Sequence, residues 1–326
     1  MEPQNSPPRH IRPMHMDRDL KYVADLIERS FSLQNDVDGQ AFLQEMRRAA
    51  KASELWGGLD MDPQEPSTQM PGFVWVEDGT IVGNVSLIRF SHHAQNIYLV
   101  ANVAVEPQYR RRGIARALTC RAIEYLHAKH QNQVWLQVNR NNQAAQDLYT
   151  SLGFHAVCCR STWHRPAGVV SSAGVEGGQV ASQSGPLRRR KKDEWPDQQK
   201  WFERLYPDNI IWHYPLWLPD FSPQVLWRPE RWEKALNLRH WTLLMKERAS
   251  GFITWQRTST FADILWLAPD PDVDLDQFIS HALIHLPPGV GRTKPLALDL
   301  PCEMAAQTLE AAGFSLFRSL VWMKLA

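Results

Sequence analysis

Hydrophobic positions along the first half of the chain change repeatedly between helical and strand spacing. Leu20, Val23, Ile27 and Phe31 recur at intervals of three or four residues, which places them on one helical face, whereas 97–105 is nearly continuous, as in a central strand. The pattern predicts helices near 20–31, 40–52, 113–129 and 144–152, and strands at 72–76, 81–90, 97–105, 134–138 and 154–163. We expect an α/β fold of the α+β type, with a mixed, mostly antiparallel sheet flanked by helices.

A segment without apolar periodicity follows this half. Residues 167–185 are rich in Gly and Ser and contain no aromatic side chain, as in a flexible linker or long exposed loop. The basic run 188–192 could bind a polyanion, but a formal net charge of +1 favours a solvated charge run beside a linker. The length of 326 residues suits two domains, which we expect at 1–166 and 195–326, joined by a linker at 167–194.

The second half repeats the pattern of the first at an offset of 160 residues. Residues 296–300, Leu309 and Gly313 correspond in this way to 136–140, Tyr149 and Gly153. Upstream of them we expect a hairpin with strands at 241–246 and 252–256 around a turn at 249–251, and a central strand at 261–267.

Charge and cysteine usage narrow the class of protein. Lys plus Arg number 36 and Asp plus Glu 35, a balance that argues against nucleic acid or a membrane as partner. No apolar run approaches the roughly 20 residues that span a bilayer, and residues 1–14 lack the apolar segment of a secretory signal, so we expect a cytoplasmic protein. The four cysteines show neither metal-ligand nor disulfide-framework spacing, and we expect free thiols and no metal.

One junction between a strand and a helix carries the features of an anion site. Residues 110–116 read Arg-Arg-Arg-Gly-Ile-Ala-Arg, directly before and within the start of the helix at 113–129. The first N–H groups of a helix lack intrahelical partners, and small residues allow a phosphate to approach them closely. The residues alone leave two interpretations open, a pyrophosphate cradle and an ordinary helix start with exposed arginines.

A second motif gives this junction a family resemblance. Asn142, Ala145, Leu148 and Tyr149 are followed by Gly153-Phe154, and together with Arg110, Gly113 and Ala115 they closely resemble the two signature motifs of the GNAT superfamily of N-acetyltransferases. The resemblance covers about residues 10–165. It implies acetyl-CoA as acyl donor and a primary amine, on a small molecule or a peptide, as acceptor.

The resemblance also implies residue roles. The backbone of one strand would hold the pantetheine arm, the helix start would bind the pyrophosphate, Asn142 would contact the cofactor, and Tyr149 would protonate the departing thiolate as general acid. The alternative for Tyr149 is a core aromatic residue. The implied cofactor-binding residues are Val103, Ala104, Val105, Arg110, Arg111, Arg112, Gly113, Ile114, Ala115, Arg116 and Asn142.

The general base is unassigned. Relatives that acetylate protein N-termini often carry a glutamate where this chain has Gln137, and an amide cannot take a proton from an amine. Glu106, His92 and His93 are weaker candidates, and an amine that arrives neutral needs no base. The general base therefore stays open on the residues alone.

The second half resembles a GNAT domain that has lost its site. Its central strand is followed by a run with four aspartates and no glycine or arginine at 268–276, and Cys302 and Leu309 stand where the first half has Asn142 and Tyr149. We expect one acetyltransferase site per chain, in a monomer or homodimer. A non-catalytic acyl-CoA sensor or scaffold is the alternative function, and we expect residues 33–71 to select the acceptor.

Overall fold

The computed structural model describes residues 10–31, 36–56, 71–169, 186–214, 216, 218–224, 231 and 235–326. The chain divides into two units, one comprising the chain up to Val157 together with Val321–Ala326, the other comprising Cys158–Leu320. The division falls within a strand and not in the expected linker, of which residues 170–185 lie outside the described part.

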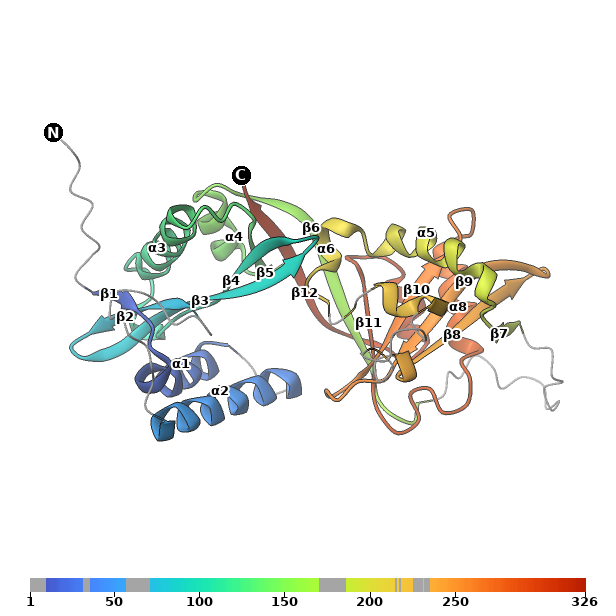
Figure 1. The fold of residues 1–326 in the computed structure, drawn as a ribbon, viewed down its shortest axis with the longest axis horizontal. Helices are drawn as coiled ribbons and strands as arrows, with labels where there is room; N and C mark the ends of the chain where they lie inside the picture. Colours follow the sequence, from blue (N-terminus) through green and yellow to red (C-terminus); the bar gives the residue numbers. More distant parts are fainter. Residues whose placement is uncertain are drawn as a thin grey trace. The chain divides into compact units, whose positions relative to one another are not determined.

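Unit 1 is a mixed sheet with helices on both faces (Figure 1). Its strand order is β1-β2-β3-β4-β5-β12-β6, antiparallel from β1 to β4 and parallel between β4 and β5. The elements are β1 (Ile11–Pro13), α1 (Met16–Ser30), α2 (Val37–Trp56), β2 (Gly72–Glu77), β3 (Thr80–His92), β4 (Gln95–Val105), η1 (Pro107–Tyr109), α3 (Ile114–Ala128), β5 (Val134–Asn139), α4 (Gln143–Thr150), β6 (Phe154–Arg165) and β12 (Ser315–Leu325).

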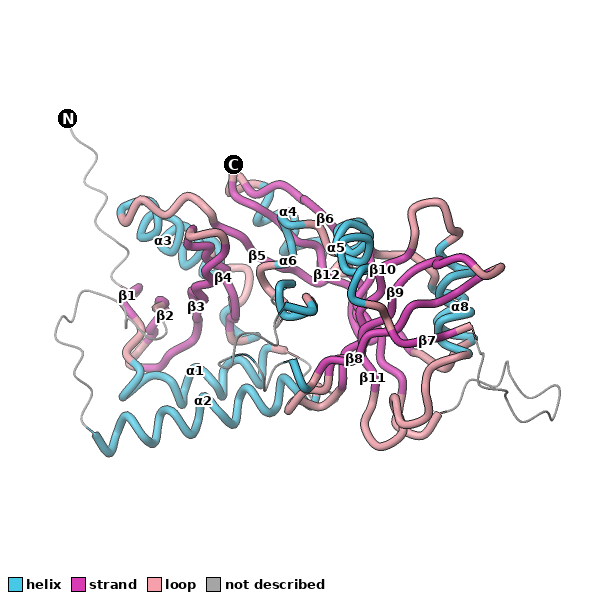
Figure 2. Tube along the Cα trace, turned by 45° about the vertical axis from the view of Figure 1, so that its right-hand side comes forward, coloured by secondary structure: helices cyan, strands magenta, loops and turns pink. Residues whose placement is uncertain are grey.

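The helices α1 and α2 lie side by side on one face of this sheet, and α3 and α4 lie on the other (Figure 2). Leu20, Val23 and Ile27 of α1 are buried in the first layer, as their spacing predicts. Ile114 and Leu118 of α3 are buried in the second. Phe31 does not continue the α1 face, because the helix ends at Ser30 and the Phe31 side chain is exposed.

Unit 2 has the strand order β12-β6-β11-β10-β9-β8-β7. The α+β class is therefore confirmed across the described part of the chain. The elements are β7 (Leu187–Arg189), η3 (Lys192–Glu194), α5 (Trp195–Leu205), α6 (Asp208–Ile211), η4 (Leu218–Phe221), β8 (Leu238–Met245), β9 (Arg248–Gln256), β10 (Asp263–Pro269), α8 (Leu275–Ile284), β11 (Leu296–Pro301) and α9 (Ala306–Ala311).

The hairpin turn of unit 2 differs from the prediction. It lies at Lys246 and Glu247, both with positive φ, and the expected turn residues 249–251 belong to β9. Gly251 is required there for packing, because a Cβ at this position would lie 2.3 Å from Cε2 of Phe278. The glycine that suggested a turn is a point of close approach between β9 and α8.

The basic run after the expected linker is part of the sheet of unit 2. Arg188 lies in β7 and pairs with Glu194, whose carboxylate also accepts hydrogen bonds from the hydroxyl of Thr242 and the backbone of Lys191. Burial raises the pKa of Glu194, but these donors outweigh it and hold the pKa at about 2. Arg188, and Arg190 through Gln198, therefore have structural partners, whereas Arg189, Lys191 and Lys192 of the run are exposed.

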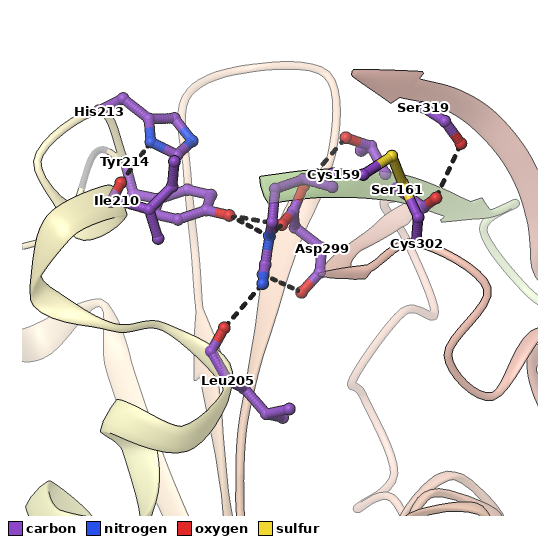
Figure 3. A network of polar contacts seen from close by, with 11 residues as sticks. Cys159, Ser161, Leu205, Ile210, His213, Tyr214, Asp299, Cys302 and Ser319 are labelled. Carbon is purple, nitrogen blue, oxygen red and sulfur yellow. Dashed lines mark hydrogen bonds and ion pairs between the residues drawn. A yellow bond between two sulfur atoms is a disulfide. The ribbon is translucent and has the colours of Figure 1, made fainter. Parts of the chain in front are cut away.

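A buried polar network and a disulfide occupy the interior of unit 2 (Figure 3). Cys159 and Cys302 form a disulfide, so the expectation of four free thiols is wrong; Cys120 and Cys158 are free. The antiparallel register of β6 and β11, which sets Arg160 opposite Pro301, brings these distant cysteines together. Cysteine spacing along the chain carries no trace of that register.

Two strands are shared by the two units. The start of β6 and the residues Val321–Ala326 at the end of β12 lie in unit 1, and the remainder of both strands lies in unit 2. The backbone N–H of Ala326 donates a hydrogen bond to the carbonyl of Gly153. The hydroxyls of Ser161 and Ser319 form a hydrogen bond of 2.7 Å. No helix in the described ranges is long and apolar enough to cross a membrane.

Candidate acyl-CoA site

The central strand β4 of unit 1 separates from β5 part of the way along its length. The parallel pairing runs from Tyr98 opposite Val134 to Val100 opposite Leu136 and goes no further in these fully described strands. Between the pairs Asn84–Ala104 and Ser86–Ala101 of β3 and β4, two residues of β4 face one of β3. This β-bulge bends β4, and it leaves the backbone of Val103, Ala104 and Val105 without ladder partners on the β5 side.

Polar side chains inside the sheet support the bulge. Asn102 adopts a left-handed conformation with φ 52°, and its carbonyl accepts a hydrogen bond of 3.0 Å from Nδ2 of the fully buried Asn84. The same Nδ2 lies 3.2 Å from Oγ of Ser86, which is also fully buried. The sequence contains a signal for this feature that the apolar pattern obscured: two polar residues on one face of a strand that is otherwise apolar.

The start of α3 forms a concave row of backbone N–H groups next to the end of β4. Gly113 is the N-cap residue, with φ 80°, and it has no side chain to cap the helix. Arg111 also has a positive φ, 66°. The turn before α3 therefore contains two left-handed residues, Arg111 and Gly113, as anion-binding nests of backbone N–H groups do. Ile114 is buried and anchors the helix start, and a Cβ at Gly113 would meet nothing within 4 Å. The space beside Gly113, where α3 begins, is therefore open.

Four exposed arginines surround this nest, and none of them forms an ion pair with a described residue. Arg110 donates from Nε to the carbonyl of Val105 at 3.1 Å, which ties the turn to β4. The guanidinium of Arg112 lies 5.0 Å from the ring centroid of Tyr109, and Arg116 donates to Oγ of Ser151 at 2.7 Å. The positive charge is held in place by neutral partners and stays available to an anion.

Helix α4 carries the remaining predicted residues. Asn142 is its N-cap and accepts a hydrogen bond of 3.2 Å from the backbone of Ala145, so Oδ1 has a structural role while Nδ2 donates to nothing in the described chain. Gly153 has φ 92°, the left-handed conformation that glycine adopts readily after a helix.

Tyr149 of α4 belongs to the hydrophobic core of unit 1. It is 7% exposed and packs edge-on against Phe154, with ring centroids 6.1 Å apart. Its hydroxyl nevertheless makes no hydrogen bond with the residues that the structure describes. Burial raises the pKa of Tyr149 to about 12, because the charged phenolate is poorly solvated there. The phenol therefore keeps its proton at any physiological pH.

The carboxylate and imidazole candidates for a base are placed unfavourably. The Oε1 atom of Glu106 accepts a hydrogen bond from Nε of Arg29 at 2.9 Å, and the Glu106 side chain is only 13% exposed. His92 and His93 lie at the β3–β4 hairpin, and an eleven-residue strand separates them from Val105 by roughly 30 Å. Gln137 is exposed on β5.

Comparison with known proteins finds a family match within unit 1. Residues 40–154 match the family described as Acetyltransferase (GNAT) family, which places a GNAT acetyltransferase domain in unit 1. The chain is 40% identical over 63 residues to the [Ribosomal protein bS18]-alanine N-acetyltransferase of Escherichia coli, covering 19% of this chain and 43% of that protein. It is 33% identical over 90 residues to the N-alpha-acetyltransferase RimI of Mycobacterium tuberculosis, covering 28% and 55%. The matched stretches thus span about half the length of these relatives.

A similar fold extends over both units. A GCN5-related N-acetyltransferase from Sphaerobacter thermophilus superposes with a TM-score of 0.58 over 98% of this chain and 96% of that one, at 14% sequence identity. At this identity the likeness shows the fold alone.

Proposed function

We propose, on the premise that residues 40–154 form a GNAT acetyltransferase domain, that this protein transfers an acetyl group from acetyl-CoA to a primary amine. The observation that carries the proposal is the junction of β4 and α3. The strand edge at 103–105 lacks ladder partners, and the nest at 110–116 follows directly. An amide-containing arm that ends in a pyrophosphate matches this order of groups.

The proposed contacts follow from the chemistry of these groups. Backbone N–H and C=O groups of Val103–Val105 pair with the pantetheine amides as a further strand would. The pyrophosphate accepts hydrogen bonds from the first N–H groups of α3 and from the exposed arginines. Nδ2 of Asn142 is free to donate to the same ligand.

Transfer proceeds in our proposal by direct attack. The amine nitrogen forms a bond to the thioester carbonyl carbon, the C–S bond breaks, and Tyr149 gives its phenolic proton to the thiolate. The conjugate base of a thiol with a pKa near 8.5 is weaker than a phenolate whose phenol has a pKa of about 12, so proton transfer from Tyr149 to the thiolate is uphill by itself. It becomes favourable overall only if the attacking nitrogen, which is positively charged after it bonds to the carbonyl carbon, gives its proton back to the phenolate as the neutral amide forms. With Gln137 in place of a carboxylate and Glu106 paired, the attacking amine must arrive neutral.

We further propose that the second half is a GNAT-like domain without a cofactor site. Its strands β10 and β11 pair only from Asp263–Leu296 to Leu265–Leu298. Beyond this point Tyr214 packs edge-on against Trp266 of β10 at 5.3 Å and hydrogen-bonds to Asp299 of β11, which Arg160 also holds (Figure 3). Side chains of unit 2 therefore bridge β10 and β11 at the position where β4 and β5 of unit 1 leave an open strand edge.

Isothermal titration with acetyl-CoA tests the cofactor site, with a matched pair of variants. Gly113 and Gly79 have φ near 80° and open space around an added Cβ, so alanine introduces similar strain at both. We expect one acetyl-CoA per wild-type chain, at least tenfold weaker binding in Gly113→Ala, and wild-type affinity in Gly79→Ala. Equal effects of the two variants would contradict the proposed site.

A thiol-release assay over a panel of amines tests catalysis. The panel should include peptides with free N-terminal alanine, because relatives bear names of alanine and N-alpha acetyltransferases. If the protein binds acetyl-CoA but acetylates no amine, the result favours the alternative function, an acyl-CoA sensor. The absence of a carboxylate at Gln137 also favours that alternative. No detectable acetyl-CoA binding removes both functions.

A further inference from the structure

We propose that Arg165 of unit 2 is the centre of a binding site for a small oxyanion, a phosphate or a carboxylate. The proposal is independent of the acetyltransferase function. Arg165 ends β6, opposite Leu296 of β11, and its side chain belongs to the interior of unit 2.

The unusual feature of Arg165 is a buried charge without a partner. The residue is 3% exposed, yet its guanidinium has neither an ion pair nor a hydrogen-bond acceptor among the residues that the structure describes, and its Nε is fully enclosed. Arg160 on the same strand offers a direct comparison, because it is 4% exposed and donates to Asp299 and to the carbonyl of Leu205. The described residues thus provide acceptors for the guanidinium of Arg160 and none for that of Arg165.

The surroundings of Arg165 are shaped by glycine and one aromatic ring. Its guanidinium carbon lies 5.1 Å from the ring centroid of Phe314. A Cβ on Gly291 would come within 3.3 Å of its Nη2, and a Cβ on Gly313 would lie 3.8 Å from its Cδ. Both glycines have positive φ, 70° and 82°. The guanidinium therefore approaches the backbone of Gly291 closely, beside the apolar side chain of Leu296, and Val169 lies beside Gly313.

The energetics favour an anionic ligand. Removing a guanidinium from water without a counter-charge carries a large penalty, of which a cation–π contact with one phenylalanine offsets only part. Burial accordingly lowers the pKa of Arg165, with no neighbouring carboxylate to oppose the effect. An oxyanion that accepts two parallel hydrogen bonds from the guanidinium would supply the missing partner, and phosphate and carboxylate both have that geometry.

Thermal unfolding of the full chain in inorganic phosphate, at constant ionic strength, tests the proposal. At a tenfold excess over the dissociation constant, we expect Tm to rise by about 3–6 °C. In Arg165→Met, which keeps the length of the side chain and removes its charge, we expect this rise to disappear and Tm without phosphate to equal or exceed that of the wild type. Acetate and phosphate titrations compared at equal ionic strength show which class of oxyanion binds more tightly.

The double variant Arg111→Ala/Arg112→Ala separates this site from the nest at α3, which also has the chemistry to bind phosphate. We expect it to keep the phosphate response. Loss of the response in this variant, or an undiminished response in Arg165→Met, would assign phosphate to the nest and overturn the proposal, as would a wild type without any response. If Arg165→Met does not fold, Arg165→Lys keeps the charge without the planar fork, and phosphate affinity must fall at least tenfold.

Discussion

Replacing Cys302 with serine removes the disulfide that closes a loop across unit 2. Cys159 and Cys302 are 143 residues apart, and cross-linking a loop of that length removes chain entropy from the unfolded state worth about 5 kcal/mol at 25 °C. Measured effects of native disulfides usually lie between about 2 and 5 kcal/mol, since the cross-linked unfolded chain retains some structure. We therefore expect Cys302→Ser to lower the free energy of unfolding by about 2–5 kcal/mol.

Urea unfolding followed by tryptophan fluorescence measures this loss, since Trp163, Trp212 and Trp266 are buried in unit 2. Cys158→Ser is the matched control, because Cys158 neighbours Cys159 in the chain but is free. The wild type under reducing conditions should behave like Cys302→Ser. The reasoning fails if Cys302→Ser is as stable as the oxidised wild type, or if Cys158→Ser loses as much.

Three further predictions concern the proposed site and the pairing in unit 2. Tyr149→Phe should lower kcat of thiol release by about 10²- to 10⁴-fold and leave acetyl-CoA affinity unchanged. The control Tyr98→Phe should leave both quantities unchanged. If Tyr149→Phe turns over as fast as the wild type, Tyr149 is not the proton donor. The value of kcat/KM should rise with pH as the acceptor amine loses its proton, and no enzyme base should contribute a further titration near neutrality. Two acceptors whose amines differ in pKa test this, because the pH profile should shift with the pKa of the amine. The pKa of Glu194 is about 2 in the folded protein, below its ordinary 4.5, so its contribution to the free energy of unfolding is complete above pH 4.5 and is lost as the pH falls toward 2. Acid unfolding of Glu194→Gln should therefore lack this pH-dependent loss of stability, which is on the order of 3 kcal/mol.

Apolar spacing predicts the elements of unit 1 well because each buries a continuous face. The run 97–105 is β4, and the glycine at 153 is left-handed, since both depend on local sequence. The bulge at Asn102 is not predictable in the same way, because it depends on Asn84 of a neighbouring strand. The hairpin at Lys246 and Glu247 escapes prediction because neither residue type favours positive φ.

The candidate site also contains residues that local sequence predicts and residues that depend on distant contacts. Motif spacing locates the nest at 110–116 and the start of α4, because each lies in one contiguous segment. It does not reveal Arg29, which pairs with Glu106 from 77 residues away, nor Arg165, whose buried guanidinium has no acceptor among the residues that the structure describes. Residues 33–35 and 57–70 of the segment 33–71, which we expect to select the acceptor, lie outside the described part of the chain.

The end of β12 has a consequence for how the protein is made. Val321–Ala326 belong to the sheet of unit 1, where β12 lies between β5 and β6, Ala326 bonds to Gly153 and Lys324 lies over the ring of Trp135. A ribosome that has finished the first 157 residues must still translate Cys158–Leu320 before this strand exists, which takes roughly 10 to 30 s at 5–20 residues per second. During that interval β5 and β6 lack the strand that separates them in the finished sheet, so the nascent unit 1 presents unpaired edges to chaperones and to neighbouring chains.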